Sequence, residues 1–156
     1  MGMIPYGKEM RMDYETYQKD YFVAPPPEPR FNFKENFWVT LFYEDYEPAI
    51  IYFERVLGPP AYIEGAGTRG WRIGNGWLTL LRGQTGNPRN IEVSFRLATP
   101  SEAEALQSAF IEAGGQSRPP SDELMYEPIR YCPVTDPFGV ELLVISLLKK
   151  SKTSKS

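Results

Sequence analysis

The stretch "IEVSFRLATPSEAEALQSAFIEAGG", residues 91–115, joins a strand pattern to a helix pattern in one run of sequence. Apolar and polar residues alternate over "IEVSFRLA", which predicts a strand. Thr99 then stands where a helix N-cap is expected, with Pro100 in the first turn and Glu102 completing a capping box. Gly114 or Gly115 ends the helix. The stretch is therefore predicted to form a strand that leads directly into a helix.

An earlier stretch, "FWVTLFYEDYEPAIIYFERVLG" at residues 37–58, has the same order. "FWVTLFY" alternates as a strand, Asp45 is expected to cap the helix that follows, and Gly58 ends it. Three strand-like segments come next, "AYIEG", "RGWRI" and "GWLTLLR", and a turn at Asn75-Gly76 is predicted to join the last two. The later stretch is followed first by a proline-rich loop. The segment "MYEPIRYCPV" comes after that loop, and a turn at "DPFG" then leads into the apolar segment "VELLVIS". The chain therefore contains an internal duplication with a period of roughly fifty residues.

The flanking segments differ in composition from this duplicated region. Residues 1–35 are predicted to form an N-terminal extension, in which "APPPEP" at residues 24–29 favours a stiff, extended linker. A short helix is expected within "KEMRMDYETYQKDYF", and its aromatic residues either dock on the main body, dock on a second subunit, or belong to a loosely held leader. Residues 36–147 form the predicted domain, with modules at about 36–83 and 90–147. Residues 148–156 are predicted to be a disordered tail rich in Lys and Ser.

The composition excludes several classes of site. The chain has no histidine and a single cysteine, Cys132, so it has no Ser-His-Asp triad, no Cys-His nucleophile pair and no histidine metal ligand. The net charge of −3 becomes −7 over residues 1–148, because the tail holds four of the 17 Lys and Arg and none of the 20 Asp and Glu. We therefore expect no nucleic-acid partner. No apolar run reaches membrane-spanning length, so we expect a cytoplasmic protein with no membrane partner.

The predicted strands each have one apolar and one mixed face, since side chains alternate along a strand. The apolar face is expected to pack under the two helices and consists of Val39, Leu41, Leu78, Leu80, Ile91, Val93, Phe95, Leu97, Val140, Leu142 and Val144. The other face combines tryptophans, hydroxyls, two carboxylates and an arginine. It is Trp38, Thr40, Trp77, Thr79, Leu81, Glu92, Ser94, Arg96, Glu141, Leu143 and Ile145. Such a face is typical of a small-molecule pocket, and the alternatives are a subunit interface and an open, solvated sheet face.

Residues 36–146 resemble the vicinal oxygen chelate superfamily of glyoxalases, bleomycin-resistance proteins and extradiol dioxygenases. "WVTLFYEDYEPAIIYFERVLG" is similar to the opening strand and helix of that superfamily, and "DPFG" with the apolar strand after it is similar to its closing signature. The resemblance implies an α+β fold of two βαβββ modules, whose curved mixed sheets surround a central cavity. It also implies a homodimer, because in such proteins the cavity is often built or completed by a second subunit.

The resemblance also implies where a metal would bind. Members that use a metal carry His or Glu at four strand positions, which match Trp38, Thr79, Glu92 and Leu143 in this chain. Of these four residues, only Glu92 is of a type that binds a cation. If the fourth position is matched two residues earlier on the same strand, it falls on Glu141. One carboxylate holds a divalent cation poorly. We therefore expect no metal and no cofactor.

These observations lead to a functional hypothesis, a metal-free small-molecule binding protein of the glyoxalase/bleomycin-resistance type that sequesters or senses an aromatic or cationic ligand. The alternatives are a metal-independent lyase or isomerase and a protein-interaction module that uses the proline-rich arm. In the enzyme, Glu92 or Glu141 is the general base, with Arg96 or Tyr131 stabilising negative charge. The sequence does not decide between binder and enzyme. The candidate ligand-binding residues are Trp38, Thr40, Trp77, Thr79, Glu92, Ser94, Arg96, Tyr131, Glu141 and Leu143.

Overall fold

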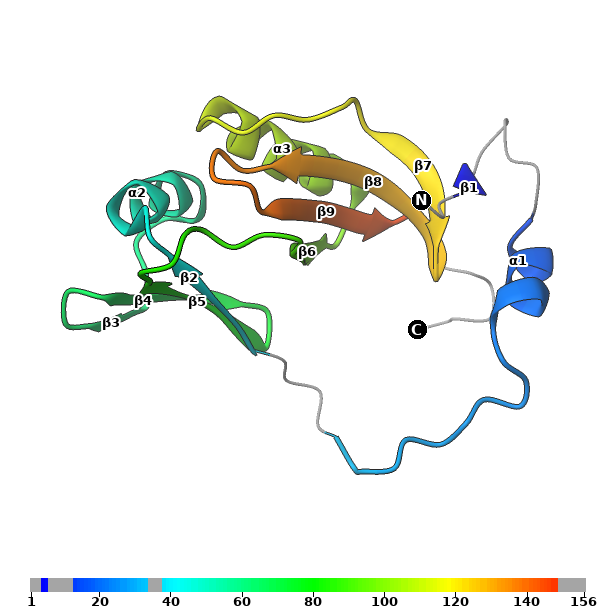
Figure 1. The fold of residues 1–156 in the computed structure, drawn as a ribbon. Coiled ribbons are helices and arrows are strands. Elements are labelled where there is room, and N and C mark those ends of the chain that lie inside the picture. The colour runs from blue at the N-terminus through cyan, green and yellow to red at the C-terminus, as the bar shows by residue number, and fades with distance from the viewer. Residues whose placement is uncertain (1–3, 6–12, 34–37, 149–156) are drawn as a thin grey trace.

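The computed structural model describes residues 4–5, 13–33 and 38–148, which form two mixed sheets and three helices (Figure 1). The four-stranded sheet has the order β2-β5-β4-β3, with β2 at Trp38–Tyr43, β3 at Tyr62–Glu64, β4 at Thr68–Ile73 and β5 at Gly76–Arg82. The five-stranded sheet has the order β1-β7-β8-β9-β6, with β1 at Ile4–Pro5, β6 at Glu92–Leu97, β7 at Ser121–Met125, β8 at Glu127–Thr135 and β9 at Glu141–Leu147. The helices are α1 at Tyr14–Tyr21, α2 at Tyr46–Leu57 and α3 at Pro100–Glu112.

The predicted duplication is confirmed by the topology of the two sheets. The first module runs β2-α2-β3-β4-β5 and the second runs β6-α3-β7-β8-β9. In each module the first strand pairs in parallel with the last, and the remaining pairs are antiparallel. β1 adds a short antiparallel strand to the outer edge of β7. The two modules therefore repeat one βαβββ unit, and β2 and β6 each form one edge of their sheet, with β3 and β1 at the opposite edges.

The helix ends follow the predicted signals with one exception. The Glu102 backbone N–H donates to Thr99 Oγ1 at 3.2 Å, so Thr99 caps α3 as predicted. Gly58 ends α2 with a φ of +89°, a conformation that glycine adopts without strain. Asp45 occupies the N-cap position of α2 but its side chain makes no capping bond. It accepts instead from Asn87 Nδ2 at 2.9 Å, which ties the loop before β6 to the start of the helix.

Two local predictions are wrong. Residues 121–124, "SDEL", were expected within the proline-rich loop, yet they form β7 together with Met125, and "MYEPIRYCPV" is divided by a turn at Tyr126. β7 was not predicted as a strand because it contains acidic residues and follows two prolines. It lies near the edge of the sheet, where polar residues are tolerated. The turn between β4 and β5 is also displaced, because Ile73 pairs with Gly76 and leaves Gly74 and Asn75 as the turn residues.

The two helices share one apolar core with both sheets. α2 and α3 contact each other, and the aromatic ring of Phe110 on α3 lies 6.2 Å from that of Phe53 on α2, centroid to centroid. The predicted apolar face is buried or half-buried except for Ile91, which precedes β6 and is 37% exposed. The core is thus continuous from one module to the other.

The "DPFG" turn connects the modules through a buried carboxylate. Asp136 is 3% exposed. Its Oδ1 accepts from the backbone N–H groups of Phe138 and Val140 at 2.8 and 2.9 Å, and its Oδ2 accepts from the Tyr43 hydroxyl at 3.0 Å. Tyr43 closes β2 of the other module. This one side chain therefore shapes its own turn and links the second module to the first.

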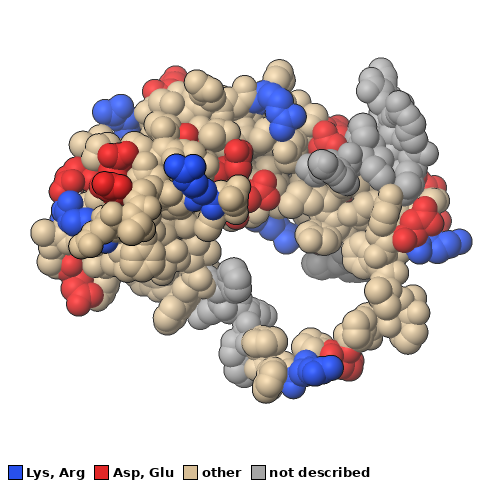
Figure 2. All heavy atoms as spheres, in the orientation of Figure 1, with Lys and Arg blue, Asp and Glu red and all other residues tan. Residues whose placement is uncertain are grey.

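The N-terminal helix docks on the same chain, which is the first of the three expected alternatives. The Tyr14 hydroxyl donates to the backbone oxygen of Tyr126 at 3.0 Å, and the Tyr126 N–H donates to the Tyr17 hydroxyl at 2.7 Å. α1 is thereby fixed to the turn between β7 and β8. The linker at residues 22–33 then runs apart from the sheets toward β2 (Figure 1), and Figure 2 shows it standing off the two modules on the face in view.

Two further expectations concern the ends of the chain and the membrane. Residues 149–156 of the predicted tail lie outside the described residues, as do residues 1–3, 6–12 and 34–37. Within the part that the structure describes, no helix combines the length and apolar character needed to cross a membrane.

Candidate functional site

The strand registers bring the predicted mixed-face residues into pairs. Trp38 lies opposite Trp77 and Thr40 opposite Thr79 in the first module. In the second module Glu92 lies opposite Glu141, and Ser94 lies opposite Leu143. Side chains of register partners share one face of a sheet. The face assignment made from alternation is therefore confirmed strand by strand.

A cavity of about 610 Å³ lies between the two modules, where the β4–β5 turn and strand β2 approach β6. Both modules contribute to its wall. The lining residues are Val39, Ile73, Asn75, Gly76, Trp77 and Leu78 from the first module, and Val93, Ser94, Phe95 and Arg96 from the second. Trp77, Ser94 and Arg96 were predicted as ligand-binding residues, and the structure brings them together here. The other seven were not predicted as ligand-binding residues. Val39, Leu78, Val93 and Phe95 were assigned to the apolar face under the helices, and Ile73, Asn75 and Gly76 lie where β4 turns into β5.

The charge of this cavity comes from a single side chain. Arg96 is the only ionisable residue among the ten that line it. Trp77 is half-buried, and the Arg72 guanidinium lies over its ring with the carbon Cζ 5.1 Å from the ring centroid. The ring of Tyr62 meets Trp77 edge-on at 6.3 Å. Trp77 thus contacts a cation and a second ring, and it also lines the cavity.

The two predicted carboxylates do not line this cavity. Glu92 and Glu141 are register partners, and both are exposed. The pKa of Glu92 is raised above its ordinary value, first by partial burial and then by the negative charge of Glu141. Glu141 Oε1 accepts from the Thr135 hydroxyl at 3.1 Å. The two carboxylates thus form a pair of neighbouring acids where the paired strands β6 and β9 begin.

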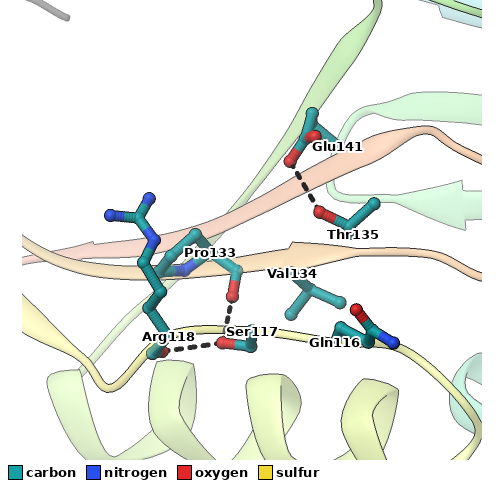
Figure 3. Close-up of a pocket in the computed structure, with 7 residues that line it drawn as sticks. All are labelled: Gln116, Ser117, Arg118, Pro133, Val134, Thr135 and Glu141. Atoms are coloured by element: carbon teal, nitrogen blue, oxygen red, sulfur yellow. Dashed lines mark hydrogen bonds between the residues drawn. The ribbon is translucent and has the colours of Figure 1, made fainter.

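Glu141 also lines a second, more polar cavity of about 230 Å³ (Figure 3). Its other lining residues are Gln116, Ser117, Arg118, Pro133, Val134 and Thr135. Figure 3 shows the guanidinium of Arg118 extending away from Ser117, whose hydroxyl donates to the Pro133 backbone oxygen. Arg118 instead donates to the Tyr131 hydroxyl at 3.3 Å. Tyr131 is therefore engaged with Arg118 and lies outside the wall of the larger cavity.

The remaining predicted residues are dispersed. Trp38 is 69% exposed and belongs to none of these cavities, although its register partner lines one. Thr40 lines a third cavity of about 240 Å³ beside the loop that contains Asn87. Thr79 is half-buried on the open sheet face, and Leu143 is 1% exposed. The ten predicted residues thus fall into several places rather than one pocket.

The side chains at the four matched metal positions do not fit a metal ion. Among Trp38, Thr79, Glu92 and Leu143 only Glu92 offers a carboxylate, Thr79 offers a neutral hydroxyl, and Leu143 is buried. No group of three or more Cys, Asp or Glu side chains within the described ranges could hold a metal ion. The thiol of Cys132 does not fit a nucleophile either, because burial raises its pKa to about 11 and keeps it protonated at neutral pH.

Comparisons with known proteins agree with this topology. No protein-family model matches the chain, and no curated protein matches it. Among solved structures, a glyoxalase/bleomycin resistance protein from Albidiferax ferrireducens is similar at 18% identity, covering 70% of this chain and 95% of that one, with a TM-score of 0.56. A glyoxalase/bleomycin resistance protein/dioxygenase family enzyme from Burkholderia phytofirmans is similar at 16% identity, with coverage of 71% and 97% and a TM-score of 0.58.

A lactoylglutathione lyase from Agrobacterium tumefaciens is similar at 13% identity, covering 77% of this chain and 96% of that one, with a TM-score of 0.56. At these identities the likeness establishes the fold and leaves activity open. The chain spans nearly the whole of each of these structures, and its two modules repeat the same βαβββ order. The protein therefore has the glyoxalase/bleomycin resistance fold, as the resemblance of its sequence predicts.

Proposed function

We propose that the protein binds a small molecule with an aromatic or apolar body in the cavity between its two modules, without a transition metal. The observation that carries the proposal is the composition of that wall, in which Trp77 from the first module lines the same cavity as Ser94 and Phe95 from the second. Ligand pockets are mostly apolar with a few polar groups that fix orientation, and their volumes run from about 300 to 1,000 Å³. The 610 Å³ cavity fits this description.

The sequence suggested an aromatic or a cationic ligand, and the residues of the cavity support the aromatic ligand better. A cationic ligand was expected to pair with Glu92 or Glu141, and neither residue lines the cavity that contains Trp77. An aromatic ring, in contrast, finds both a tryptophan and apolar wall residues there. Aromatic contacts contribute about 0.5–1.5 kcal/mol beyond the area that they bury.

A first prediction tests the cavity with a neutral aromatic probe. Phenylnaphthylamine should bind the protein and accept excitation energy from tryptophan, and Trp77→Ala should weaken its binding about tenfold because the ring contact is lost. Trp38→Ala is the matched control, since Trp38 shares the sheet face but not the cavity. Fluorescence titration measures both dissociation constants. Equal affinities for wild type and Trp77→Ala would contradict the proposal.

A second candidate function, a metal-independent enzyme, is favoured by one observation. Glu92 has a raised pKa and a neighbouring carboxylate, a pattern typical of general bases. Glu92 is the first residue of β6 and lies two residues before Ser94, which lines the cavity. Glu92 is therefore near the cavity although it does not line it. A substrate would then have to extend from the cavity toward the acid pair.

Glu92→Gln separates the two functions. If Glu92 is a general base, turnover should fall about a hundredfold or more while ligand affinity stays within about twofold. The acid limb of the pH–rate profile should lie above the ordinary carboxyl pKa of 4.5, and Glu141→Gln should move it to lower pH by removing the neighbouring charge. Conversion of small aromatic substrates followed by NMR provides the rates. Unchanged turnover in Glu92→Gln would exclude this role.

We also propose that the protein is a homodimer, with the open face of the four-stranded sheet at the interface. Trp38, Phe42 and Tyr62 lie on that face and are all exposed, and exposed aromatic patches commonly mark interfaces. Sedimentation equilibrium at micromolar concentration should give twice the chain mass of 17.8 kDa. Trp38→Glu should weaken the dimer by placing a charge in the interface. A wild-type mass of 17.8 kDa would contradict the proposal.

A further inference from the structure

We propose that the ligand of the cavity between the modules carries an anionic group, a carboxylate or sulfonate, which binds Arg96 while the aromatic body of the ligand lies against Trp77. This inference rests on the proposed function of that cavity and adds the chemical class of the ligand. It reverses the sign of charge expected from the sequence alone, where the two carboxylates of the mixed face pointed to a cationic ligand.

The first argument is the charge of the wall. Ten residues line the cavity, and Arg96 is the one that carries a charge. The other polar side chains there are Ser94 and Asn75, which can both donate hydrogen bonds. Carboxylates and related oxyanions bind guanidinium groups through charge-assisted hydrogen bonds, and hydroxyl and amide donors in the same cavity can add neutral ones.

The second argument is that other arginines of the sheets have partners that Arg96 lacks. Arg82 donates to Glu47 at 2.6 Å, and Arg130 donates to Glu104 and Asp122 at 2.8 and 2.6 Å. Over residues 38–148 no hydrogen bond or ion pair of the Arg96 side chain is present. Its register partner on β9 is Ile145, an apolar residue. The Arg96 charge is therefore not compensated by its own sheet.

The third argument is the distance to the acid pair. Glu92 lies four residues before Arg96 on the same strand, so the two Cα atoms are separated by about 13 Å at the rise of an extended strand. This exceeds the Debye length of about 8 Å at physiological ionic strength, so exposed charges at that separation are largely screened. The interaction of Glu92 with the Arg96 guanidinium is therefore largely screened and does not neutralise it.

The test compares two probes that share an aromatic body and differ in charge. Anilinonaphthalene sulfonate carries an anionic group and phenylnaphthylamine does not. Wild-type protein should bind the sulfonate more tightly. Arg96→Gln should weaken sulfonate binding about ten- to a hundredfold, the size of a charge-assisted contact, and leave phenylnaphthylamine binding within about twofold. Arg96→Lys should retain most of the preference because it keeps the charge.

Arg89→Gln is the matched control, because it removes one positive charge from an exposed residue shortly before β6 that does not line the cavity. Its sulfonate affinity should change less than about threefold, and thermal unfolding should show that all variants are folded. If both probes bind wild type and Arg96→Gln equally well, the anionic class is overturned while the proposed cavity function stands. If neither probe binds, or if Trp77→Ala binds both as wild type does, the cavity function fails and this inference fails with it.

Discussion

Replacing Phe110 by alanine should lower the free energy of unfolding by about 3–5 kcal/mol, the usual cost of deleting a buried phenylalanine. Phe110 is fully buried, and its ring contacts Tyr52 and Phe53 of α2 as well as Phe95 of β6, with centroid distances of 5.9, 6.2 and 5.6 Å. The cavity left by the change would thus lie in the core that both modules share. Stability of the two modules should fall together rather than in the second module alone.

Ile111→Ala is the matched control, because Ile111 follows on the same helix and is 41% exposed. Its cost should be below about 1 kcal/mol, since about two-fifths of the residue is already in water and alanine has the higher helix propensity. Urea unfolding followed by circular dichroism and by tryptophan fluorescence gives both values, as Trp71 lies in the core of the first module. Two separate transitions in Phe110→Ala, with the first module unaffected, would contradict a shared core.

Replacing Asp136 by alanine should lower the free energy of unfolding by about 3 kcal/mol. The change leaves the N–H groups of Phe138 and Val140 and the Tyr43 hydroxyl without their acceptor, and each unsatisfied buried donor costs about 1–3 kcal/mol, partly offset by removing a buried charge. Burial and the nearby Asp136 raise the pKa of Tyr43, so its hydroxyl remains a donor. Chemical unfolding of the variant measures the cost, and a loss below about 1 kcal/mol would contradict the linking role of Asp136.

Asp136→Asn isolates the charge from the hydrogen bonds. The amide oxygen can still accept from the turn, so the cost should be smaller than for alanine. The pKa of Asp136 is raised above its ordinary value of 3.8, chiefly by burial. A folded-state pKa above the unfolded one stabilises the protein below the unfolded pKa, and this contribution is lost as pH rises through the folded pKa. The stability of Asp136→Asn relative to wild type should therefore increase from about pH 4 toward neutrality, and a flat difference would contradict this assignment.

Most of the fold could be predicted because strand and helix periods and their end signals are local. Thr99 and Gly58 mark helix ends whose geometry depends on neighbouring residues alone. β7 was missed because its pairing with β8 and β1, rather than its own composition, makes it a strand. The turn at Tyr126 was missed for a related reason, since a non-glycine residue with a φ of +67° gives no turn signal in sequence.

The candidate site could be predicted only in part. Alternation predicted which residues share a face, and the pairs Trp38–Trp77 and Glu92–Glu141 are register partners. The position of the cavity depends on how β2 and the β4–β5 turn of the first module lie relative to β6 of the second, and no strand pattern encodes the placement of one sheet against the other. Arg96 was for that reason grouped with the two carboxylates, although it lines the cavity and they do not.

The most direct test of the central claim, that the cavity between the modules binds a small aromatic molecule, is an NMR titration of the indole N–H signals. The chain has three tryptophans, Trp38, Trp71 and Trp77, and Trp→Phe variants assign their signals. During titration with anilinonaphthalene sulfonate or phenylnaphthylamine, the Trp77 signal should shift most, while that of Trp71, which is buried and donates to the Gly58 backbone oxygen, should stay in place. Titrations in which the Trp77 signal does not move, or moves no more than that of Trp71, would contradict the account.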